Sequence, residues 1–269
     1  MMDFENLNQE GRILWNQKAA FWDNLHGEFG NRFHQELVSP SVEALLKPQP
    51  GQQILDIACG SGQMSRRLAA LGCNVTAIDF SEELINFSKK RGTPQGNPIL
   101  YQVMDATDEK SLISLGEQKF DHLVCTMAFM DIPDLTPLFR AAKKLLKPNG
   151  SFVFATAHPA FFSNNPGFIS EKNEVDGQTV YTHALKITNY LSLPPIKGVG
   201  APNEPAPHIY YHRPLHELLG YAFQNGFVLD ALLEPGFDPP KPEDAKPLHW
   251  TTLWQMPPVL SGRFKLTQP

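Results

Sequence analysis

Apolar runs that suit buried strands alternate with helical patterns between residues 53 and 157. The runs are ILDIA (54–58), NVTAID (74–79), PILYQVM (98–104), FDHLVCTM (120–127) and SFVFATA (151–157). Apolar residues between these runs recur at helical spacing, and a short helix is expected over residues 108–115. Strands that alternate with helices in this way predict parallel βαβ units and a doubly wound α/β sheet.

Local signals predict where two of the helices begin and end. Ser81 is a suitable N-cap, and Glu82 and Glu83 favour the first turn of the helix that follows it. That helix should stop at Gly92 and the preceding one at Gly72, because glycine readily adopts the left-handed conformation that ends helices.

The regular alternation stops at residue 158 and returns at residue 214. In between, only TVYTHALKITNYLSL (179–193) alternates enough to suggest a strand or hairpin. An irregular stretch of this length inside a compact domain is usually functional, so we predict an inserted cap. A helix from Pro214, a sixth strand FVLDALL (227–233) and a last strand PVLSGRFKL (258–266), antiparallel at the sheet's end, are expected after it.

The N-terminal segment carries a helical stripe of large apolar side chains. Trp15, Ala19 and Trp22 stand at positions i, i+4 and i+7, so they share one face of a helix. Two interpretations are open, a helix packed on the edge of the sheet and a lid that closes over a ligand.

Composition and charge narrow the classes of function. The chain has 269 residues and a formal net charge of −5, and its longest basic run is KKR (89–91). A basic footprint for nucleic acid is therefore missing at the level of the whole chain. The polar, acidic N-terminus is unlike a signal peptide, and no apolar stretch approaches the length of a membrane span. Cys59, Cys73 and Cys125 form no C-x-x-C pair and are expected to be reduced and buried, so a cytoplasmic location is predicted.

A glycine-punctuated corner joins the first strand to its helix in QQILDIACGSGQMSRRLAALG (52–72). Such a corner forms a nucleotide site, because glycine lets the backbone approach a ligand and the helix N-terminus offers free N–H groups. The dinucleotide fingerprint G-x-G-x-x-G is incomplete, since Gly60 and Gly62 are followed by Ser65. Asp56 lies inside the strand, four residues before Gly60. The corner therefore argues for a nucleotide-like ligand but weakens the case for a dinucleotide.

Five stretches follow one another in a recognisable order. They are LDIACGSGQ (55–63), VTAIDFS (75–81), VMDATD (103–108), FDHLVCTMAFMDIPDL (120–135) and LLKPNGSFVFATAHPAF (145–161). Together they resemble the motifs of class I S-adenosylmethionine (SAM)-dependent methyltransferases, whose first motif is an acid followed by G-x-G-x-G. Ala58 replaces the first of those glycines. The resemblance covers residues 50–160 and, more loosely, residues 208–266.

The resemblance implies a fold and a cofactor. The predicted fold class is α/β, a doubly wound, mostly parallel, seven-stranded Rossmann-like sheet with a last antiparallel strand and an inserted cap. The implied cofactor is SAM. The predicted parts of the chain are an N-terminal helical arm or lid (1–49), a SAM-binding Rossmann-like core (50–157), a substrate-side cap (158–213) and the C-terminal part of the core (214–269).

The resemblance also implies which residues hold the cofactor. Nine positions are carried over: Asp56, Ala58, Gly60, Gly62, Asp79, Phe80, Asp105, Ala106 and Met127. The two glycines would face the methionine part of SAM, with Asp56 behind them, either ordering the turn or holding the amino group through water. Asp79 would accept hydrogen bonds from the ribose hydroxyls. Phe80, Asp105 and Ala106 would lie at the adenine. As alternatives, Asp79 only begins a turn and Met127 is core.

Two absences bear on the methyl acceptor. Methyltransferases of exocyclic or amide nitrogens often carry N/D-P-P-Y after strand four, where this chain has CTMA (125–128). Asp131 and Asp134 follow that strand without an evident third ligand, so no metal is expected. The predicted function is methyl transfer from SAM to an oxygen or nitrogen of a small organic molecule, with neither nucleic acid nor membrane as partner. RNA or protein methylation, or a non-methylating reaction in a SAM-binding protein, are the alternatives.

Aromatic side chains indicate where the acceptor would bind. Trp22, Phe161, Tyr210 and Tyr211 suit an apolar or aromatic small molecule, although aromatic residues of a cap are also ordinary core. The chain is expected to act as a monomer or homodimer.

Two histidines are candidates for a general base. His158 follows strand five, and His212 lies where the cap returns to the sheet. An imidazole titrates near neutral pH and can accept a proton from the acceptor. As an alternative, each histidine satisfies backbone groups at a turn.

Overall fold

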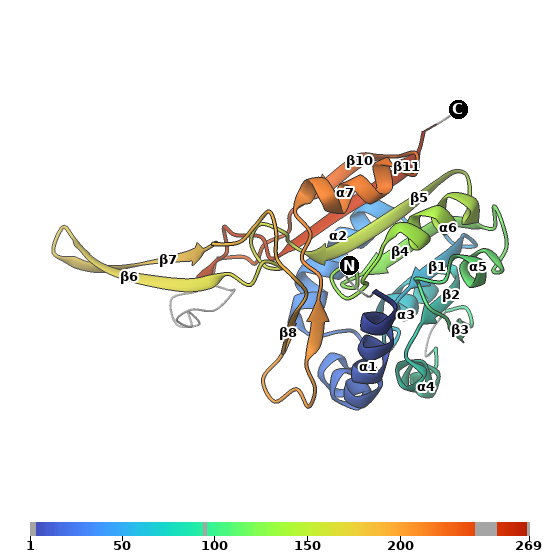
Figure 1. The fold of residues 1–269 in the computed structure, drawn as a ribbon, viewed down its shortest axis with the longest axis horizontal. Coiled ribbons are helices and arrows are strands. Elements are labelled where there is room, and N and C mark those ends of the chain that lie inside the picture. Colours follow the sequence, from blue (N-terminus) through green and yellow to red (C-terminus); the bar gives the residue numbers. More distant parts are fainter. Residues whose placement is uncertain (1–3, 94–95, 240–251, 268–269) are drawn as a thin grey trace.

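The computed structural model describes residues 4–93, 96–239 and 252–267. Helices cover both faces of a seven-stranded sheet with the order β10-β11-β5-β4-β1-β2-β3 (Figure 1). The strands are β1 (Gln53–Ile57), β2 (Asn74–Asp79), β3 (Leu100–Val103), β4 (Phe120–Thr126), β5 (Leu146–Ala157), β10 (Phe227–Leu233) and β11 (Val259–Leu266).

The sheet has the predicted parallel character and one antiparallel strand. β1 pairs in parallel with β2 and β4, β2 with β3, and β4 with β5. β11 is antiparallel to both of its neighbours, β5 and β10. It therefore lies one place in from the end of the sheet, and β10 forms the edge.

Alternate residues of each strand enter two separate cores, as the pleat of a strand requires. On one face, Ile54, Val124 and Val153 pack with residues of α2 (Ser39–Leu46), α3 (Gln63–Ala70) and α4 (Glu82–Arg91). On the other face, Leu55, Leu123 and Phe152 pack with α5 (Glu109–Ile113), α6 (Thr136–Leu145) and α7 (Leu215–Phe223). Burial on both faces explains why the strand sequences are almost continuously apolar.

Helix ends and cysteines follow the sequence-based expectations. Ser81 caps α4 through its side chain, which accepts a hydrogen bond from the Leu84 N–H, and Gly92 ends that helix with a φ of +66°. The three cysteines are free and buried. No helix in the described part of the chain is long and apolar enough to cross a membrane.

The N-terminal segment divides into two parts with different positions. α1 (Phe4–His26) lies beside α4 and against β9 (His208–Tyr210), along the edge of the sheet where β1 to β4 end (Figure 1). The π-helix η1 (His34–Val38) and α2 instead pack on β5 and β11. The predicted arm of residues 1–49 is thus a cover in its first half and part of the core in its second half.

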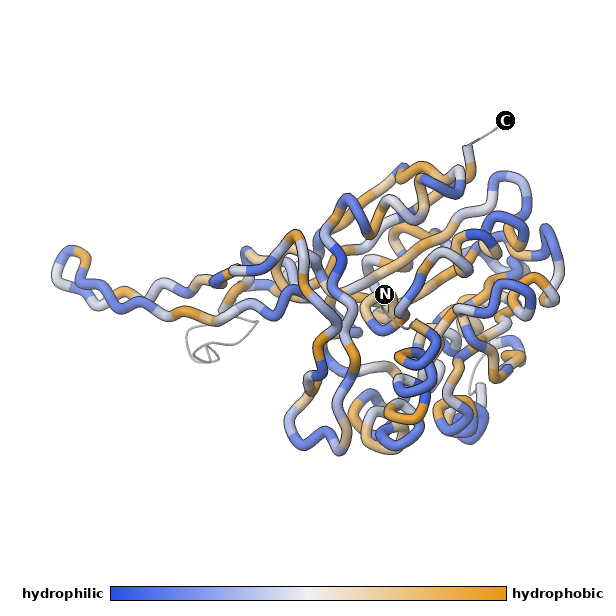
Figure 2. The backbone as a smooth tube through the Cα atoms, in the orientation of Figure 1, coloured by the Kyte–Doolittle hydropathy of each residue, from blue (hydrophilic) through white to orange (hydrophobic). Residues whose placement is uncertain are grey.

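The inserted segment forms two hairpins rather than one continuous cap. β6 (Gly167–Val175) and β7 (Gln178–Lys186) make a long hairpin that projects away from the sheet, with apolar and polar residues mixed along it (Figures 1 and 2). β8 (Ile196–Gly198) and β9 (His208–Tyr210) pair beside α1. Only this second hairpin returns to the carboxyl edge of the sheet.

Candidate functional site

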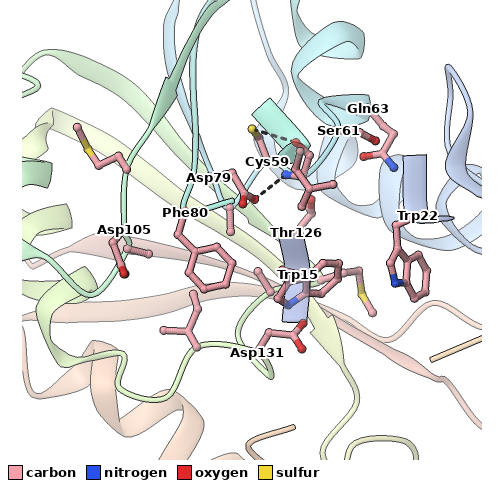
Figure 3. Close-up of a pocket in the computed structure, with 18 of the residues that line it drawn as sticks. Trp15, Trp22, Cys59, Ser61, Gln63, Asp79, Phe80, Asp105, Thr126 and Asp131 are labelled. Atoms are coloured by element: carbon pink, nitrogen blue, oxygen red, sulfur yellow. Dashed lines mark hydrogen bonds between the residues drawn. The ribbon is translucent and has the colours of Figure 1, made fainter. Parts of the chain in front are cut away.

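A cavity lies where β1, β2 and β4 end, the edge at which doubly wound sheets bind ligands (Figure 3). The loops after β1, β2, β3 and β4 form its floor and sides. α1 covers it with Trp15 and Trp22, together with His34 from η1. The space between these residues is about 850 Å³ when the open solvent at its mouth is included.

The two glycines of the corner have different tasks. Gly60 lines the cavity with a φ of +57°, and a Cβ built on it would meet no atom within 4 Å. Its bare side is thus the place where a ligand can approach the backbone. A Cβ on Gly62 would instead lie 2.6 Å from the Tyr101 Oη, and Gly62 has a φ of +84°. Gly62 is therefore required for packing rather than for contact with the cavity.

Asp79 ends β2 and holds two turns through its carboxylate. Its Oδ2 accepts a hydrogen bond from the Gly60 N–H at 2.9 Å, and its Oδ1 accepts one from the Ser81 N–H at 2.9 Å. Burial raises the pKa of Asp79 to about 6, against the lowering effect of these two bonds. Each oxygen keeps a second lone pair, and Asp79 lines the cavity. The turn-forming role and the predicted ligand contact are thus compatible.

Asp56 is buried behind the corner and is not one of the residues that line the cavity. Its Oδ2 accepts a hydrogen bond from the hydroxyl of Ser65, the residue found where the dinucleotide fingerprint has glycine. Burial raises the pKa of Asp56 to about 7, although the Ser65 bond opposes this. Asp56 therefore holds the glycine corner from its buried side. This position is compatible with the predicted role of ordering the turn.

A slot beside Asp79 gathers the residues predicted for adenine. Phe80, Asp105 and Ala106 line the cavity there, and Phe80 and Asp105 are seen at one end of the site in Figure 3. The Asp105 Oδ2 accepts a hydrogen bond from the Asn8 Nδ2 of α1 at 2.7 Å. Ala58 and Met127, which were also predicted to hold the cofactor, line the cavity as well, and both have a positive φ.

Polar contacts tie α1 to the loops of the site. Besides Asn8, the Asn16 Oδ1 accepts a hydrogen bond from the Ser81 hydroxyl at 2.6 Å. Asp23 pairs with Arg91 of α4 through both carboxylate oxygens. The helix with the tryptophan stripe is therefore anchored across the mouth of the cavity, the position expected of a lid.

A buried ionic cluster joins α1 to the loop before β9. The Glu204 Oε1 lies 3.2 Å from the Lys18 Nζ and 2.7 Å from the His208 Nε2, and it accepts a hydrogen bond from the Trp22 Nε1 at 2.8 Å. The His208 Nδ1 lies 3.5 Å from Asp131, which lines the cavity. Burial favours the neutral form of the Glu204 carboxyl, but the hydrogen bonds from His208 and Trp22 outweigh this effect and lower the pKa of Glu204 to about 2.

The two histidines predicted as bases are not among the described residues that line the cavity. The His158 Nε2 lies 2.8 Å from Glu234, and its Nδ1 accepts a hydrogen bond from the Ala160 N–H. The His212 Nε2–H donates to the carbonyl of Tyr190, and its Nδ1 faces the Ser163 hydroxyl. Each histidine therefore bonds one backbone group and one side chain.

The predicted acceptor contacts are only partly brought together. Trp22 lines the cavity, whereas Phe161, Tyr210 and Tyr211 do not. Tyr210 stacks on His208 with ring centroids 5.0 Å apart, and the Tyr211 N–H bonds to the carbonyl of Met130. These tyrosines therefore support the wall of the site from behind.

Sequence reasoning missed several polar residues that line the cavity. His26 lies four residues after Trp22 on the same face of α1, so an extension of the stripe would have found it. Ser61 and Gln63 are part of the glycine corner. His34 begins the π-helix η1 and carries no comparable signal, and Asp131 was considered only as a possible metal ligand.

The residues present fit SAM. Gly60 leaves room at the backbone, Asp79 has free lone pairs for ribose hydroxyls, and Phe80 offers an aromatic face to adenine. The Ser61 Oγ, the Gln63 Nε2 and the His26 Nε2 are buried in the cavity wall without hydrogen-bond partners among the described residues. Such unpartnered groups suit the polar amino-acid end of the cofactor.

The described residues of the site show no arrangement for a metal ion. Within residues 4–93, 96–239 and 252–267, no group of three His, Cys, Asp or Glu side chains is placed to hold one. Asp134 instead accepts a hydrogen bond from the Thr136 N–H, and Asp131 faces His208.

We expect SAM binding to weaken by up to about tenfold per pH unit as the pH falls below about 6, the pKa of Asp79. The protonated carboxyl must lose its proton before both oxygens can accept from the ribose. Asp105 and Asp131 also face Asp79, and both oppose its ionisation. Calorimetric titration at pH 5, 6, 7 and 8 measures the effect. Asp79→Asn should remove the drop between pH 6 and 5, and an unchanged drop would contradict the assignment.

Comparison with known proteins places the chain in a family. The sequence profile of a family described as "Methyltransferase domain" matches residues 55–154. A ubiquinone biosynthesis O-methyltransferase from Colwellia psychrerythraea is 30% identical over 169 residues, which cover 59% of this chain and 68% of that protein. One from Xanthomonas axonopodis pv. citri is 35% identical over 124 residues, 45% of this chain and 50% of that protein.

A solved structure supports the same fold. The S-adenosylmethionine-dependent methyltransferase from Mesorhizobium loti superimposes with a TM-score of 0.60 at 24% identity, covering 84% of this chain and 95% of that one. The predicted fold class, cofactor and enzyme class are thereby confirmed. The chain belongs to the class I S-adenosylmethionine-dependent methyltransferases, with SAM as its cofactor.

Proposed function

We propose that this enzyme methylates a hydroxyl oxygen of a compact apolar or aromatic molecule inside a covered chamber. The observation that carries the proposal is the wall that α1 places over the cavity. Trp15 and Trp22, with ring centroids 6.1 Å apart, line the cavity on the side of α1 (Figure 3), and Met127 lines it as well. Flat apolar surfaces of this kind bind aromatic ligands well.

The charges around the cavity argue against a nucleic acid substrate. No Lys or Arg is among the described residues that line it, and a nucleic acid would need such groups for its phosphates. Lys18, a cation on α1, is buried and paired with Glu204. RNA methylation therefore has little support at this site.

The similar proteins support oxygen as the atom that accepts the methyl group. Two proteins similar to this chain are ubiquinone biosynthesis O-methyltransferases. The matches span about two thirds of one relative and half of the other, so the shared part is mainly the cofactor core. We carry over only the chemistry of oxygen methylation. A cytoplasmic location and a monomeric or homodimeric state stay predictions.

The chain's own residues would position the cofactor and the acceptor and exclude water from the reacting atoms. SAM supplies an electrophilic methyl group on a sulfonium. Asp79 and the Gly60 backbone would fix the cofactor, while Trp15 and Trp22 would hold the acceptor ring in line with the methyl carbon. Alignment of this kind accounts for much of the rate of a direct displacement. The anchored α1 keeps bulk water from the reacting atoms.

Incubation with methyl-labelled SAM and an acceptor panel tests the proposal. The panel contains small phenols and catechols, matched anilines, bulk tRNA and a denatured protein. We expect label in phenolic hydroxyls, located by mass and by NMR of the new methyl group. Gly60→Val, which puts a branched side chain into the cofactor side of the cavity, is the negative control. Label confined to RNA, protein or the anilines would refute the proposal.

A further inference from the structure

His34 stands at an unusual place in the backbone. It begins η1, a π-helix of five residues, and lines the cavity. π-Helical turns are rare and often occur at functional sites. Gly30, with a φ of +88°, lets the chain pass close by, since a Cβ there would lie 2.6 Å from the His34 Cβ. The local backbone therefore turns this imidazole towards the cavity.

A neighbouring side chain fixes the tautomer of His34. The Asn31 Oδ1 accepts a hydrogen bond from the His34 backbone N–H at 3.2 Å, so this atom is the amide oxygen. The same oxygen lies 2.8 Å from the His34 Nδ1. An oxygen can only accept, so Nδ1 carries the ring proton. In the neutral ring, Nε2 is therefore an unprotonated nitrogen with a lone pair.

The surroundings keep His34 neutral. Burial lowers the pKa of His34 to about 4. The neighbouring His26 ring lies edge-on to His34, with centroids 4.5 Å apart, and burial followed by the proximity of His34 lowers the pKa of His26 as well. Gln63 and Trp22, which also line the cavity, carry no charge. At neutral pH the Nε2 lone pair is thus available.

Two other histidines are engaged away from the cavity. His158 and His212 are bonded at both ring nitrogens and are not among the described residues that line it. His26 lines the cavity, but no contact fixes its tautomer. Among the described residues that line the site, His34 is the histidine whose orientation and proton position are both set.

We propose that the His34 Nε2 is the general base of the reaction, an inference that rests on the proposed methylation of a hydroxyl. The acceptor oxygen forms its bond to the methyl carbon as the S–CH₃ bond breaks, and the S–C electron pair stays on sulfur as a neutral thioether. The O–H electron pair stays on oxygen, and the proton moves to Nε2. The resulting imidazolium keeps its Nδ1–H bond to Asn31 and releases the Nε2 proton to solvent.

A weak base is sufficient for this task. An oxygen that gains a methyl group while it still holds its proton becomes an oxonium, which is a far stronger acid than an imidazolium. Proton transfer to a neutral imidazole is therefore downhill late in the displacement. A positioned base of this kind typically contributes about 10²–10⁴-fold to the rate.

His34→Ala tests the base directly. We expect kcat for a phenolic acceptor to fall by about 10²–10⁴-fold, with the SAM dissociation constant changed by less than about threefold. Added imidazole should restore part of kcat by filling the vacated space. His216→Ala, which removes an exposed histidine of α7, is the matched control and should turn over normally. A normal kcat in His34→Ala, or a loss confined to SAM affinity, would overturn the proposal.

Asn31→Asp supplies a readout that a structural role would not move. A carboxylate beside Nδ1 stabilises the imidazolium and should raise the pKa of His34 by about one unit or more. Because the base acts unprotonated, the acid limb of the kcat profile should shift upward from about pH 4 by the same amount. Coincident wild-type and Asn31→Asp profiles would contradict the assignment.

The ring itself can be observed without turnover. Nitrogen NMR of the free protein should show His34 as the Nδ1–H tautomer at pH 7, with titration only below about pH 5. An Nε2–H tautomer or a charged ring at pH 7 would refute this proposal and leave the proposed function intact. Conversely, turnover of anilines but not phenols would refute the proposed hydroxyl chemistry, and the base assignment with it, even if the tautomer is as expected.

Discussion

Glu204→Ala is expected to lower the free energy of unfolding by about 3–5 kcal/mol, the usual cost of removing one partner from a buried ion pair. The Glu204 side chain is fully buried, and its Oε1 meets the Lys18 Nζ, the His208 Nε2 and the Trp22 Nε1 within 3.2 Å. Its Oε2 accepts from the Gly200 N–H at 2.6 Å. Alanine would leave Lys18 buried without its paired carboxylate and the Trp22 N–H without a partner.

Urea unfolding monitored by tryptophan fluorescence measures this change. Glu117→Ala removes an exposed carboxylate and should change the stability by no more than about 0.5 kcal/mol. The double variant Lys18→Met/Glu204→Met should recover part of the loss, since an apolar pair often replaces a buried ion pair without cost. If Glu204→Ala lowers the free energy of unfolding by less than about 1 kcal/mol, Glu204 is not paired with Lys18 and His208 in solution.

The pH dependence of that loss has a defined sign. The pKa of Glu204 is lowered from 4.5 to about 2, so its contribution to stability is complete above about pH 4.5 and disappears as the pH falls towards 2. Burial opposes protonation of His208, but Asp131 and Glu204 outweigh it and raise the pKa of His208 above 6.5. Its contribution is complete below pH 6.5 and is lost as the pH rises through that raised value. The difference between wild type and Glu204→Ala should therefore be largest between about pH 4.5 and 6.5.

Asp79→Ala is expected to weaken SAM binding by at least about a hundredfold at pH 7.5. Two hydrogen bonds from ribose hydroxyls to a carboxylate contribute about 1.5–3 kcal/mol each, and about 3 kcal/mol corresponds to more than a hundredfold. The same carboxylate holds the Gly60 and Ser81 N–H groups, so the variant also loosens the corner. Both effects reduce affinity for the cofactor.

Calorimetric titration with SAM and with its demethylated product measures the loss. Asp108→Ala, which removes an exposed aspartate at the start of α5, controls for the change in net charge. Circular dichroism shows whether the variant is folded at the titration temperature. If the variant is folded and binds SAM with unchanged affinity, Asp79 only forms the turn. The hydrogen bonds that Asp79 accepts from the Gly60 and Ser81 N–H groups would then be its whole role.

Local sequence signals were sufficient for most of the fold. Strand β4 could be predicted because burial on both faces demands a continuous apolar run, and α4 because Ser81 and Gly92 mark its ends chemically. The corner at Gly60 could be predicted for the same reason, since a positive φ beside a ligand leaves few residue choices. Each of these features depends on contacts within a few residues of the chain.

The position of the insertion could not be predicted from its composition. Phe168 and Tyr181 lie on the β6–β7 hairpin that projects from the sheet (Figure 1), and Tyr181 is 60% exposed. Aromatic side chains favour strands as readily as ligand sites. Composition alone therefore does not distinguish a hairpin arm from a chamber wall.

The sequence by itself determined the doubly wound sheet, the cofactor corner and the acid at the end of β2, because local periodicity and backbone geometry specify them. Only the tertiary structure decided which groups surround the acceptor. Lys18 and Glu204 form an ion pair although they are 186 positions apart in the sequence. His34 reaches the cavity from the π-helix η1, which no periodic pattern in the sequence predicts. His158 and His212, which lie at suitable places along the chain, are turned to other partners. Contacts between distant segments follow from how the segments pack, and a single sequence carries no local signal for that packing.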